Sequence, residues 1–388
     1  MPDETPEDLI YLDHAATTPL DPAVLRVMTP YFTQRFYNAS SRYAPASDNK
    51  RDLEALRAQN AEILGASAGE IIFTSGGSEA DNLALKGVAF AQLANGRSQI
   101  ITTPIEHHAV LNTVKFLAEQ HGFEIVWLPV APDGKVEPAD VQAAITQRTA
   151  LVSVMYANNE VGTLEPIAQI GRITHAAGVP FHTDAVQAGG TLSLEVNNLN
   201  VDLLSLSAHK FYGPKGVGLL YVRRGTPFVA QMQGGEQERG RRAGTENLPG
   251  VVGLTAALQL AYQNVARNNR HLIAMRDRLI AGVRERVPNA LLTGAEPPNR
   301  LPGHASFCFE GVEGEAILVG LEEQGILCSS GSACAAGSTE PSHVLTALGL
   351  SDELAHTAVR FTLGRSTTPA QIERVLDVLP QVVAQFVS

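Results

Sequence analysis

The sequence lacks the features that would place it in several common protein classes. Its 388 residues include only three cysteines, Cys308, Cys328 and Cys334, and this small odd number does not suit a disulfide framework. No apolar run approaches the roughly 20 residues of a membrane span, and the acidic N-terminus is unlike a signal peptide. We therefore predict a soluble cytoplasmic protein with no membrane partner, whose cysteines are either buried or reactive.

Basic residues are also scarce. The formal net charge is −11, and no basic run occurs, so the chain is a poor candidate for binding nucleic acid. Only six residues are lysines, and two of them, Lys210 and Lys215, stand in the stretch SLSAHKFYGPKG. That stretch is therefore the first place to look for lysine chemistry.

What the chain does contain is the material of a large α/β protein. Hydrophobic residues make up 44% and charged residues 18%, which predicts a sizeable core, and the length favours two domains. Short apolar runs alternate with helical patterns through the first two thirds, which is typical of a parallel sheet with helices on both faces. From about Pro249 the pattern changes to a long helix followed by mixed elements. We predict a large domain over residues 14–258 and a small domain of residues 1–13 and 259–388.

Candidate ligand-binding residues follow the predicted strands, whose carboxyl ends bind ligands in sheets of this kind. Gly77 and Ser78 begin a helix after the turn FTSGG, where free backbone N–H groups can hold a phosphate. Such a turn can also simply connect a strand to a helix without binding a ligand. His107 follows the next strand. Asn159, in ANNEVGT, can hold a carboxylate or a ring hydroxyl, or can simply form a turn.

Two further strand ends carry an acid and a lysine. Asp184 ends the run PFHTD, with Gln187 three residues later, and a buried acid there needs a cationic partner such as a protonated ring nitrogen. Lys210 follows the run LLSLSAH, where burial would lower its pKa and make it a nucleophile or base. A phosphate cradle, an acid for a ring nitrogen and a desolvated lysine together describe a pyridoxal 5′-phosphate site, in which the lysine forms a Schiff base.

Several motifs, in order along nearly the whole chain, resemble those of the NifS/IscS-type cysteine desulfurases of the class-V aminotransferase family. They include YLDHAATTPL, FTSGGSEADNLALKG, IEHHAV, HTDAVQ, SAHKFYGPKG, RRAGTENLPG and SSGSAC. The resemblance implies a homodimeric fold-type-I enzyme with a mostly parallel seven-stranded sheet. It also implies conversion of L-cysteine to L-alanine through an external aldimine and a quinonoid, with the sulfur passing to the enzyme's own cysteine as a persulfide.

The same resemblance implies roles for residues around the cofactor. Lys210 matches the Schiff-base lysine, Asp184 the partner of the pyridinium nitrogen and Gln187 the partner of the ring hydroxyl, while His107 matches a catalytic imidazole stacked on the ring. A further set matches the groups that hold the phosphate: Gly77, Ser78, Ser207, His209 and, from the partner subunit, Thr245. No metal site is expected.

On the substrate side, Asn159 and Arg360 match the groups that clamp the carboxylate, for which a guanidinium fork is well shaped. Asn159 also borders the cofactor. Cys334 lies in CSSGSACAAGS, a run of small residues that predicts a mobile loop over about residues 328–340. The resemblance makes Cys334 the thiol that receives the sulfur for an acceptor or scaffold protein, in iron–sulfur cluster assembly or tRNA thiolation. Cys308 and Cys328 have apolar neighbours and are expected to be buried.

Other functions remain open on these residues. An aminotransferase would make Cys334 a bystander, and a selenocysteine lyase would tolerate its loss because selenium leaves more easily than sulfur. A non-catalytic protein on the same fold is a third alternative. The presence of Lys210, Asp184, His107 and Cys334 in one chain favours the desulfurase.

Overall fold

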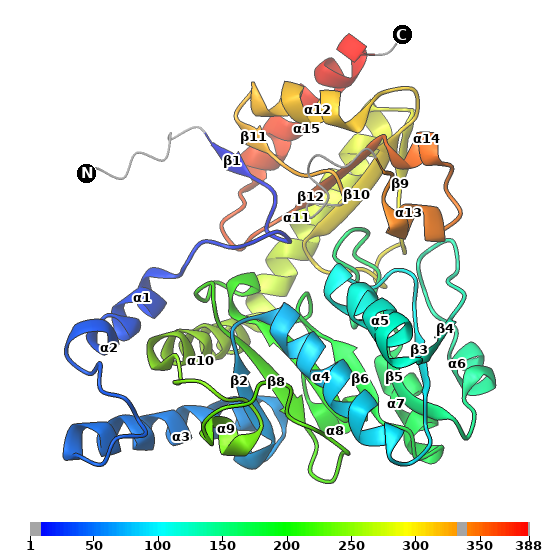
Figure 1. Ribbon diagram of the computed structural model, residues 1–388. Coiled ribbons are helices and arrows are strands. Elements are labelled where there is room, and N and C mark those ends of the chain that lie inside the picture. The colour runs from blue at the N-terminus through cyan, green and yellow to red at the C-terminus, as the bar shows by residue number, and fades with distance from the viewer. Residues whose placement is uncertain (1–8, 332–339, 387–388) are drawn as a thin grey trace.

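The computed structural model describes residues 9–331 and 340–386. Cys334 and most of the predicted cysteine loop therefore lie outside the described residues, as do residues 1–8 of the predicted small domain. The described chain has two parts, each built around its own sheet, one above the other in Figure 1. The predicted α/β class is confirmed.

The larger part contains a sheet of seven strands in the order β2-β8-β7-β6-β5-β3-β4. The strands are β2 (Ile71–Thr74), β3 (Gln99–Thr102), β4 (Glu124–Trp127), β5 (Thr149–Ser153), β6 (Phe181–Asp184), β7 (Leu203–Ser207) and β8 (Gly218–Val222). Strands β3 to β7 pair in parallel, and only β8 runs antiparallel to both of its neighbours. The predicted mostly parallel sheet is confirmed.

Helices cover both faces of this sheet (Figure 1). One face packs on α4 (Gly77–Leu93) and α5 (His108–His121). The opposite face packs mainly on α1 (Pro22–Met28), α3 (Ala44–Leu64), α6 (Pro138–Ala144), α7 (Ile167–Ala176), α8 (Val196–Leu199) and α10 (Leu248–Gln263). The strands alternate between the two faces. In β2, Ile71 and Phe73 join one core and Ile72 joins the other, as expected when successive side chains point to opposite sides.

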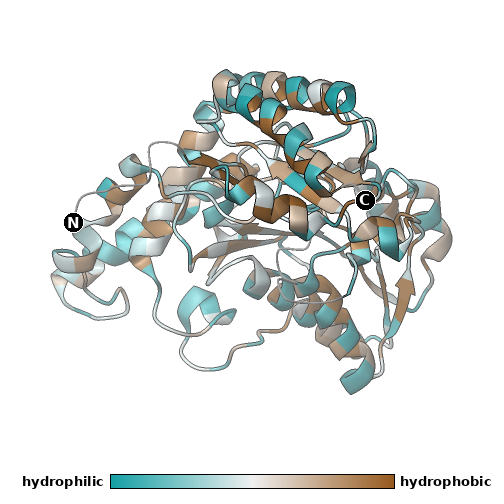
Figure 2. Ribbon diagram, turned by 90° about the horizontal axis from the view of Figure 1, so that it is seen from above, coloured by the Kyte–Doolittle hydropathy of each residue, from teal (hydrophilic) through white to brown (hydrophobic). Residues whose placement is uncertain are grey.

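Short elements complete the larger part. They are α2 (Pro30–Thr33), η1 (Ala68–Glu70), η2 (Ala208–Lys210) and α9 (Gln237–Gly240). The helices carry both hydrophobic and hydrophilic residues around their circumference (Figure 2), as is typical of helices that cover a sheet on one side and meet water on the other.

The smaller part contains an antiparallel sheet of β9 (Ala290–Leu292), β10 (His304–Phe309) and β12 (Ala358–Thr362), and a parallel pair of β1 (Ile10–Tyr11) with β11 (Ile326–Leu327). Its helices are α11 (Val265–Arg286), α12 (Gly314–Glu322), α13 (His343–Ala347), α14 (Asp352–Ala355) and α15 (Pro369–Phe386). Ile10 and Leu12 share one core with residues between 272 and 383. This separate core supports the proposed discontinuous small domain.

The long helical pattern that begins near Pro249 is not one helix. It forms α10 and α11, which meet at Asn264, where the backbone leaves the helical region with φ −115° and ψ 3°. The break redirects the chain from the core of the larger part to that of the smaller part.

Candidate active site

The carboxyl ends of β5, β6 and β7 lie at one edge of the central sheet because these strands are parallel. A cavity of about 420 Å³ opens at this edge. Its lining includes ten of the residues predicted from the sequence: Gly77, Ser78, His107, Asn159, Asp184, Gln187, Ser207, His209, Lys210 and Arg360. Thr245 is exposed and does not line this cavity, and Cys334 lies outside the described residues.

Lys210 ends the short helix η2, directly after β7. Its Nζ donates hydrogen bonds to the backbone oxygens of Ala15, at 2.5 Å, and Ala16, at 2.9 Å. The Nε2 of Gln187 donates to the same oxygen of Ala15 at 3.1 Å. The segment after β1 therefore orients two of the predicted cofactor residues, a role that the sequence analysis did not give it.

Asp184 is the last residue of β6 and is only 6% exposed. Its Oδ1 accepts a hydrogen bond from the backbone N–H of Val186 at 2.9 Å. Burial raises the pKa of Asp184 to about 6, against the smaller opposing effects of that hydrogen bond and the charge of Lys210. A cation placed against this carboxyl group would favour its ionised form.

His107 caps the N-terminus of α5, and its Nδ1 accepts a hydrogen bond from the backbone N–H of Ala109 at 3.1 Å. Burial, followed by the charge of Lys210, lowers the pKa of His107 to about 4. The ring is therefore neutral at physiological pH. Since Nδ1 is the acceptor, the proton of the neutral ring belongs on Nε2.

The start of α4 forms a compact turn at the end of the cavity. A Cβ added at Gly77 would lie 2.8 Å from Cγ2 of Val186 and 3.4 Å from Cβ of Ser207, so the close approach of the backbone requires glycine. Ser78, Ser207 and His209 also line the cavity. The N–H groups and the positive dipole end of a 17-residue helix favour an anion at this position.

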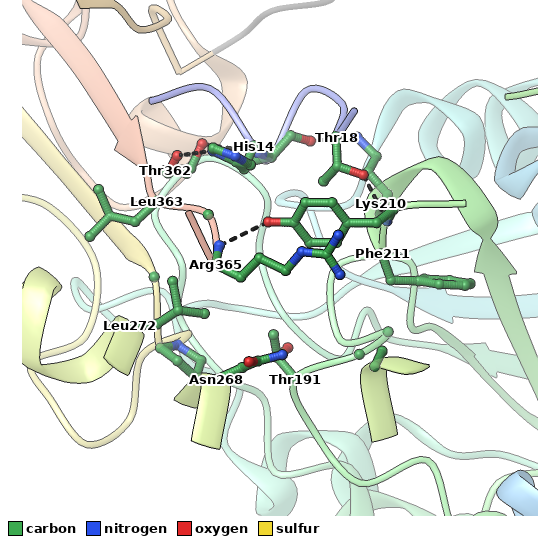
Figure 3. A pocket seen from close by; sticks show the side chains of 18 of the residues that line it. His14, Thr18, Thr191, Lys210, Phe211, Asn268, Leu272, Thr362, Leu363 and Arg365 are labelled. Atoms are coloured by element: carbon green, nitrogen blue, oxygen red, sulfur yellow. Dashed lines mark hydrogen bonds between the residues drawn. The ribbon is translucent and has the colours of Figure 1, made fainter. Parts of the chain in front are cut away.

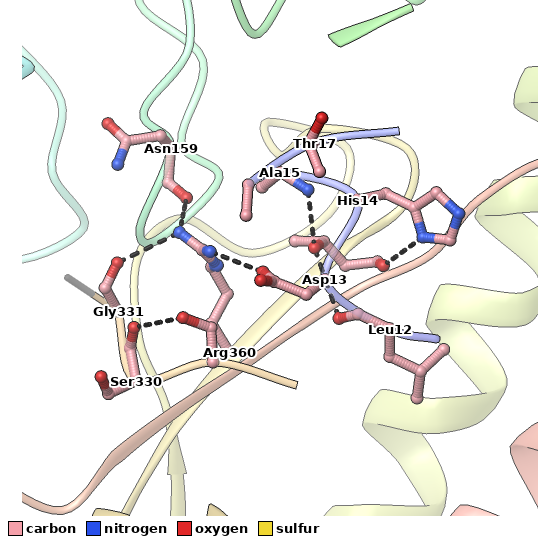
Figure 4. A network of polar contacts seen from close by, with 12 residues as sticks. Leu12, Asp13, His14, Ala15, Thr17, Asn159, Ser330, Gly331 and Arg360 are labelled. Atoms are coloured by element: carbon pink, nitrogen blue, oxygen red, sulfur yellow. Dashed lines mark hydrogen bonds and ion pairs between the residues drawn. The ribbon is translucent and has the colours of Figure 1, made fainter. Parts of the chain in front are cut away.

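Arg360 lies in the middle of β12 and projects between the two parts of the molecule (Figure 4). Its Nη1 donates to the backbone oxygens of Asn159, at 2.9 Å, and Gly331, at 3.1 Å, and its Nη2 donates to Oδ1 of Asp13 at 2.7 Å. The Arg360 side chain is only 2% exposed. Asp13, which the sequence analysis did not single out, therefore supplies the counter-charge of the predicted carboxylate clamp.

Comparisons with known proteins place the chain in a family. Residues 10–375 match the family described as aminotransferase class-V. The chain belongs to this family. It is 48% identical over 377 residues to a protein named cysteine desulfurase IscS from Clostridium botulinum, with 97% of this chain and 94% of that protein covered. It is also 48% identical over 382 residues to a cysteine desulfurase IscS from Methanosarcina thermophila, with 98% and 94% covered.

A solved structure described as a NifS-like protein superposes on this chain with a TM-score of 0.90 at 34% identity, covering 97% of this chain and all of that one. The resemblance to NifS/IscS-type proteins seen in the motifs is thereby confirmed at the level of the family, together with the fold-type-I architecture.

Four polar side chains that line this class-V cavity were missed by the sequence analysis as site residues: Asp81, His108, Glu160 and His343. Asp81 stands three residues after Ser78 in α4, so helical spacing could have placed it on the same face. The rings of His108 and His343 meet edge to face at 4.7 Å. His343 comes from α13 in the smaller part, and no local pattern in the sequence could have brought it here.

Figure 3 shows a second, smaller cavity, of about 100 Å³. It shares Ala15, Gln187 and Lys210 with the first. Much of the rest of its lining is apolar, including Phe211 and Leu272. The candidate chemistry therefore lies in the larger cavity. Within the described residues, no cluster of His, Cys, Asp and Glu could hold a metal ion. No helix in that part of the chain is long and apolar enough to cross a membrane.

Proposed function

We propose that this class-V protein is a pyridoxal-phosphate-dependent cysteine desulfurase, which converts L-cysteine to L-alanine and takes up the sulfur on Cys334. The observation that carries the proposal is the meeting of Lys210, the buried acid Asp184 and the helix start at Gly77 around one cavity, with Arg360 at its border. The printed names of the relatives support the choice of substrate.

The residues present fit the cofactor. The phosphate would bind at the N-terminus of α4, with Ser78, Ser207 and His209 as ligands. The carboxyl of Asp184, whose pKa burial raises, would be stabilised in its ionised form by pairing with the protonated ring nitrogen. When bound, the cofactor supplies an electron sink for the charge that develops at the substrate Cα.

Thr245 completes the proposed phosphate site from a second subunit. It is exposed on its own chain and does not reach the cavity there. In a homodimer, the Thr245 hydroxyl would donate a hydrogen bond to the phosphate bound by the other subunit.

The chain's own groups would perform the remaining tasks. Lys210 would hold the cofactor covalently and then move the Cα proton. Gln187 would bond the ring hydroxyl through its amide. His107, neutral with its proton on Nε2, would suit a ring stacked on the cofactor, because it would add no positive charge beside the protonated ring nitrogen. Arg360 and Asn159 would bind the substrate carboxylate.

Cys334 would act as the sulfur acceptor. Its thiolate attacks the sulfur of L-cysteine, a sulfur–sulfur bond forms, the carbon–sulfur bond breaks, and its electron pair stays with the carbon, which is then protonated to give L-alanine. The persulfide would pass to an acceptor or scaffold protein of iron–sulfur cluster assembly or tRNA thiolation. A cytoplasmic location remains part of this proposal.

The test measures L-alanine formation and persulfide formation in wild type and Cys334→Ser. The variant should bind cofactor and substrate but make little alanine, and mass spectrometry of the wild type without reductant should find the extra sulfur on the peptide of Cys334. Cys308→Ser and Cys328→Ser are matched controls, because Cys308 is buried and Cys328 packs against the small-domain core. Full alanine production by Cys334→Ser would instead favour a selenocysteine lyase or an aminotransferase.

A further inference from the structure

A layer of polar side chains lies between α4 and the central sheet, on the face that is otherwise apolar. His182 and Asp184 project from β6 toward the same face, because they are two residues apart. The sheet register places Ser153 of β5 beside His182, and Ser205 of β7 beside Asp184. Asp81 reaches this layer from α4 and lines the cavity together with Asp184.

His182 is fully buried and neutral. Burial lowers its pKa to about 3. Its Nδ1 lies 2.9 Å from Oγ of Ser153, and its Nε2 lies 3.0 Å from Oγ of Ser205. A neutral imidazole has one donor and one acceptor nitrogen, and the two serines use both. Nε2 also lies 3.6 Å from Oδ1 of Asp81, but the neutral ring offers that carboxyl no positive charge.

Asp81 is only 1% exposed, and its Oδ1 has no hydrogen-bond partner among the described residues. Burial is the largest effect on its pKa and raises it, and the charges of Asp184 and Glu106 raise it further, against a hydrogen bond with Ser205 that lowers it. Glu106 is itself buried and held by Thr103 and the backbone of Met155. An ionised Asp81 would be an unpaired buried charge beside a second carboxylate, which is costly.

We propose that Asp81 is a positioning residue, a neutral carboxylic acid that leaves Asp184 as the carboxylate facing the cofactor's ring nitrogen. This inference rests on the proposed function for its cofactor, but not for the protonation of Asp81 itself. Two neighbouring buried carboxyls ionise in separate steps, because the first charge opposes the second. The proton therefore stays on Asp81, because no cation among the described residues lowers its pKa. Asp184 loses its proton first, because the charge of Lys210 favours its ionised form.

Infrared spectroscopy of the full-length protein tests the protonation state. At neutral pH, the difference spectrum of wild type minus Asp81→Asn should contain the C=O stretch of a protonated carboxylic acid, shifted in deuterated water. Glu106 cancels in this difference because both proteins contain it. Bands of an ionised carboxylate in place of the acid band would overturn the proposal, whether or not cofactor is bound.

The affinity for pyridoxal phosphate tests the positioning role. Asp81→Ala should bind the cofactor about tenfold more weakly, because it loses the hydrogen bond to Ser205, the residue that the sheet register places beside Asp184. Asp81→Asn should restore the affinity to within about threefold, because the amide is neutral and of the same shape. Asp184→Asn removes the charge itself, so its affinity for pyridoxal phosphate should stay well below that of wild type.

Three outcomes of the affinity test are decisive against the inference or its premise. If Asp81→Ala binds as wild type does, the positioning role is wrong. If Asp81→Asn is as weak as Asp184→Asn, Asp81 acts as a charge and the inference is also wrong. If wild type fails to bind pyridoxal phosphate, the proposed function fails, and the infrared difference still decides the state of Asp81.

Discussion

Replacing Asp13 by Asn is expected to weaken both the fold and the binding of L-cysteine. Asp13 Oδ1 accepts a hydrogen bond from Arg360 Nη2 at 2.7 Å, and the side chains are 18% and 2% exposed. A hydrogen bond between charged groups contributes about 1.5–3 kcal/mol to stability. Since water reaches Asp13 in part, we expect a loss near the lower end, about 1.5 kcal/mol.

The effect on binding follows from the position of the guanidinium group. In Asp13→Asn, Arg360 keeps its Nη1 hydrogen bonds to the backbone of Asn159 and Gly331 but loses the anion that fixes Nη2. If Arg360 clamps the substrate carboxylate, KM for L-cysteine should rise about tenfold, equivalent to about 1.4 kcal/mol. The value of kcat should change by less than about threefold, because Asp13 itself does not line the larger cavity, where Lys210 and Asp184 lie.

Urea unfolding and steady-state alanine formation measure the two effects. Asp277→Asn is the matched control, because Asp277 pairs at 2.8 Å with Arg276, whose side chain is also buried at 3% exposure, and neither lines the larger cavity. The control should leave KM unchanged. If Asp13→Asn is less stable but has an unchanged KM, Asp13 does not position Arg360 for the substrate carboxylate. A lower KM would show instead that Asp13 competes with the substrate for Arg360.

Three further predictions concern the cofactor residues. Borohydride reduction of the loaded protein should label Lys210 and not Lys215, and Lys210→Ala should lose turnover; a label on Lys215 would contradict the assignment. Gly77→Ala should lose cofactor affinity, read from the absorbance of bound cofactor, because its Cβ would lie 2.8 Å from Val186; unchanged affinity would count against the phosphate cradle. Burial raises the pKa of Asp184 from 3.8 to about 6, so folding of the cofactor-free protein favours the protonated form of this side chain. The contribution of Asp184 to the free energy of unfolding is therefore complete below pH 3.8 and is lost as the pH rises through 6, by at most about 3 kcal/mol. The stability difference between wild type and Asp184→Asn, measured by urea unfolding, should follow this dependence, and a difference independent of pH would disprove it.

Much of the fold could be predicted because its information is local. The alternation of apolar runs and helical patterns predicted the parallel sheet with helices on both faces, and residues that follow a strand predicted the edge where the cavity lies. Local patterns did not reveal that β8 reverses its direction, since a strand reads the same in either orientation. They also did not reveal the break at Asn264, because the helical pattern continues through it.

The sequence by itself determined which residue types can do chemistry here: a lysine and an acid after buried strands, a glycine-led helix start, and an arginine in a late strand. Only the tertiary structure decided how these groups are held. The backbone oxygens of Ala15 and Ala16 accept hydrogen bonds from Lys210, which lies nearly 200 residues later in the sequence. Asp13 pairs with Arg360, which is even farther away in the sequence. In the sequence, Asp81 is one polar residue of a helix. Only the packing of α4 on the sheet brings it close to His182 and into the same cavity lining as Asp184. Charge states and hydrogen-bond partners depend on burial and on contacts between distant segments, and a linear pattern records neither.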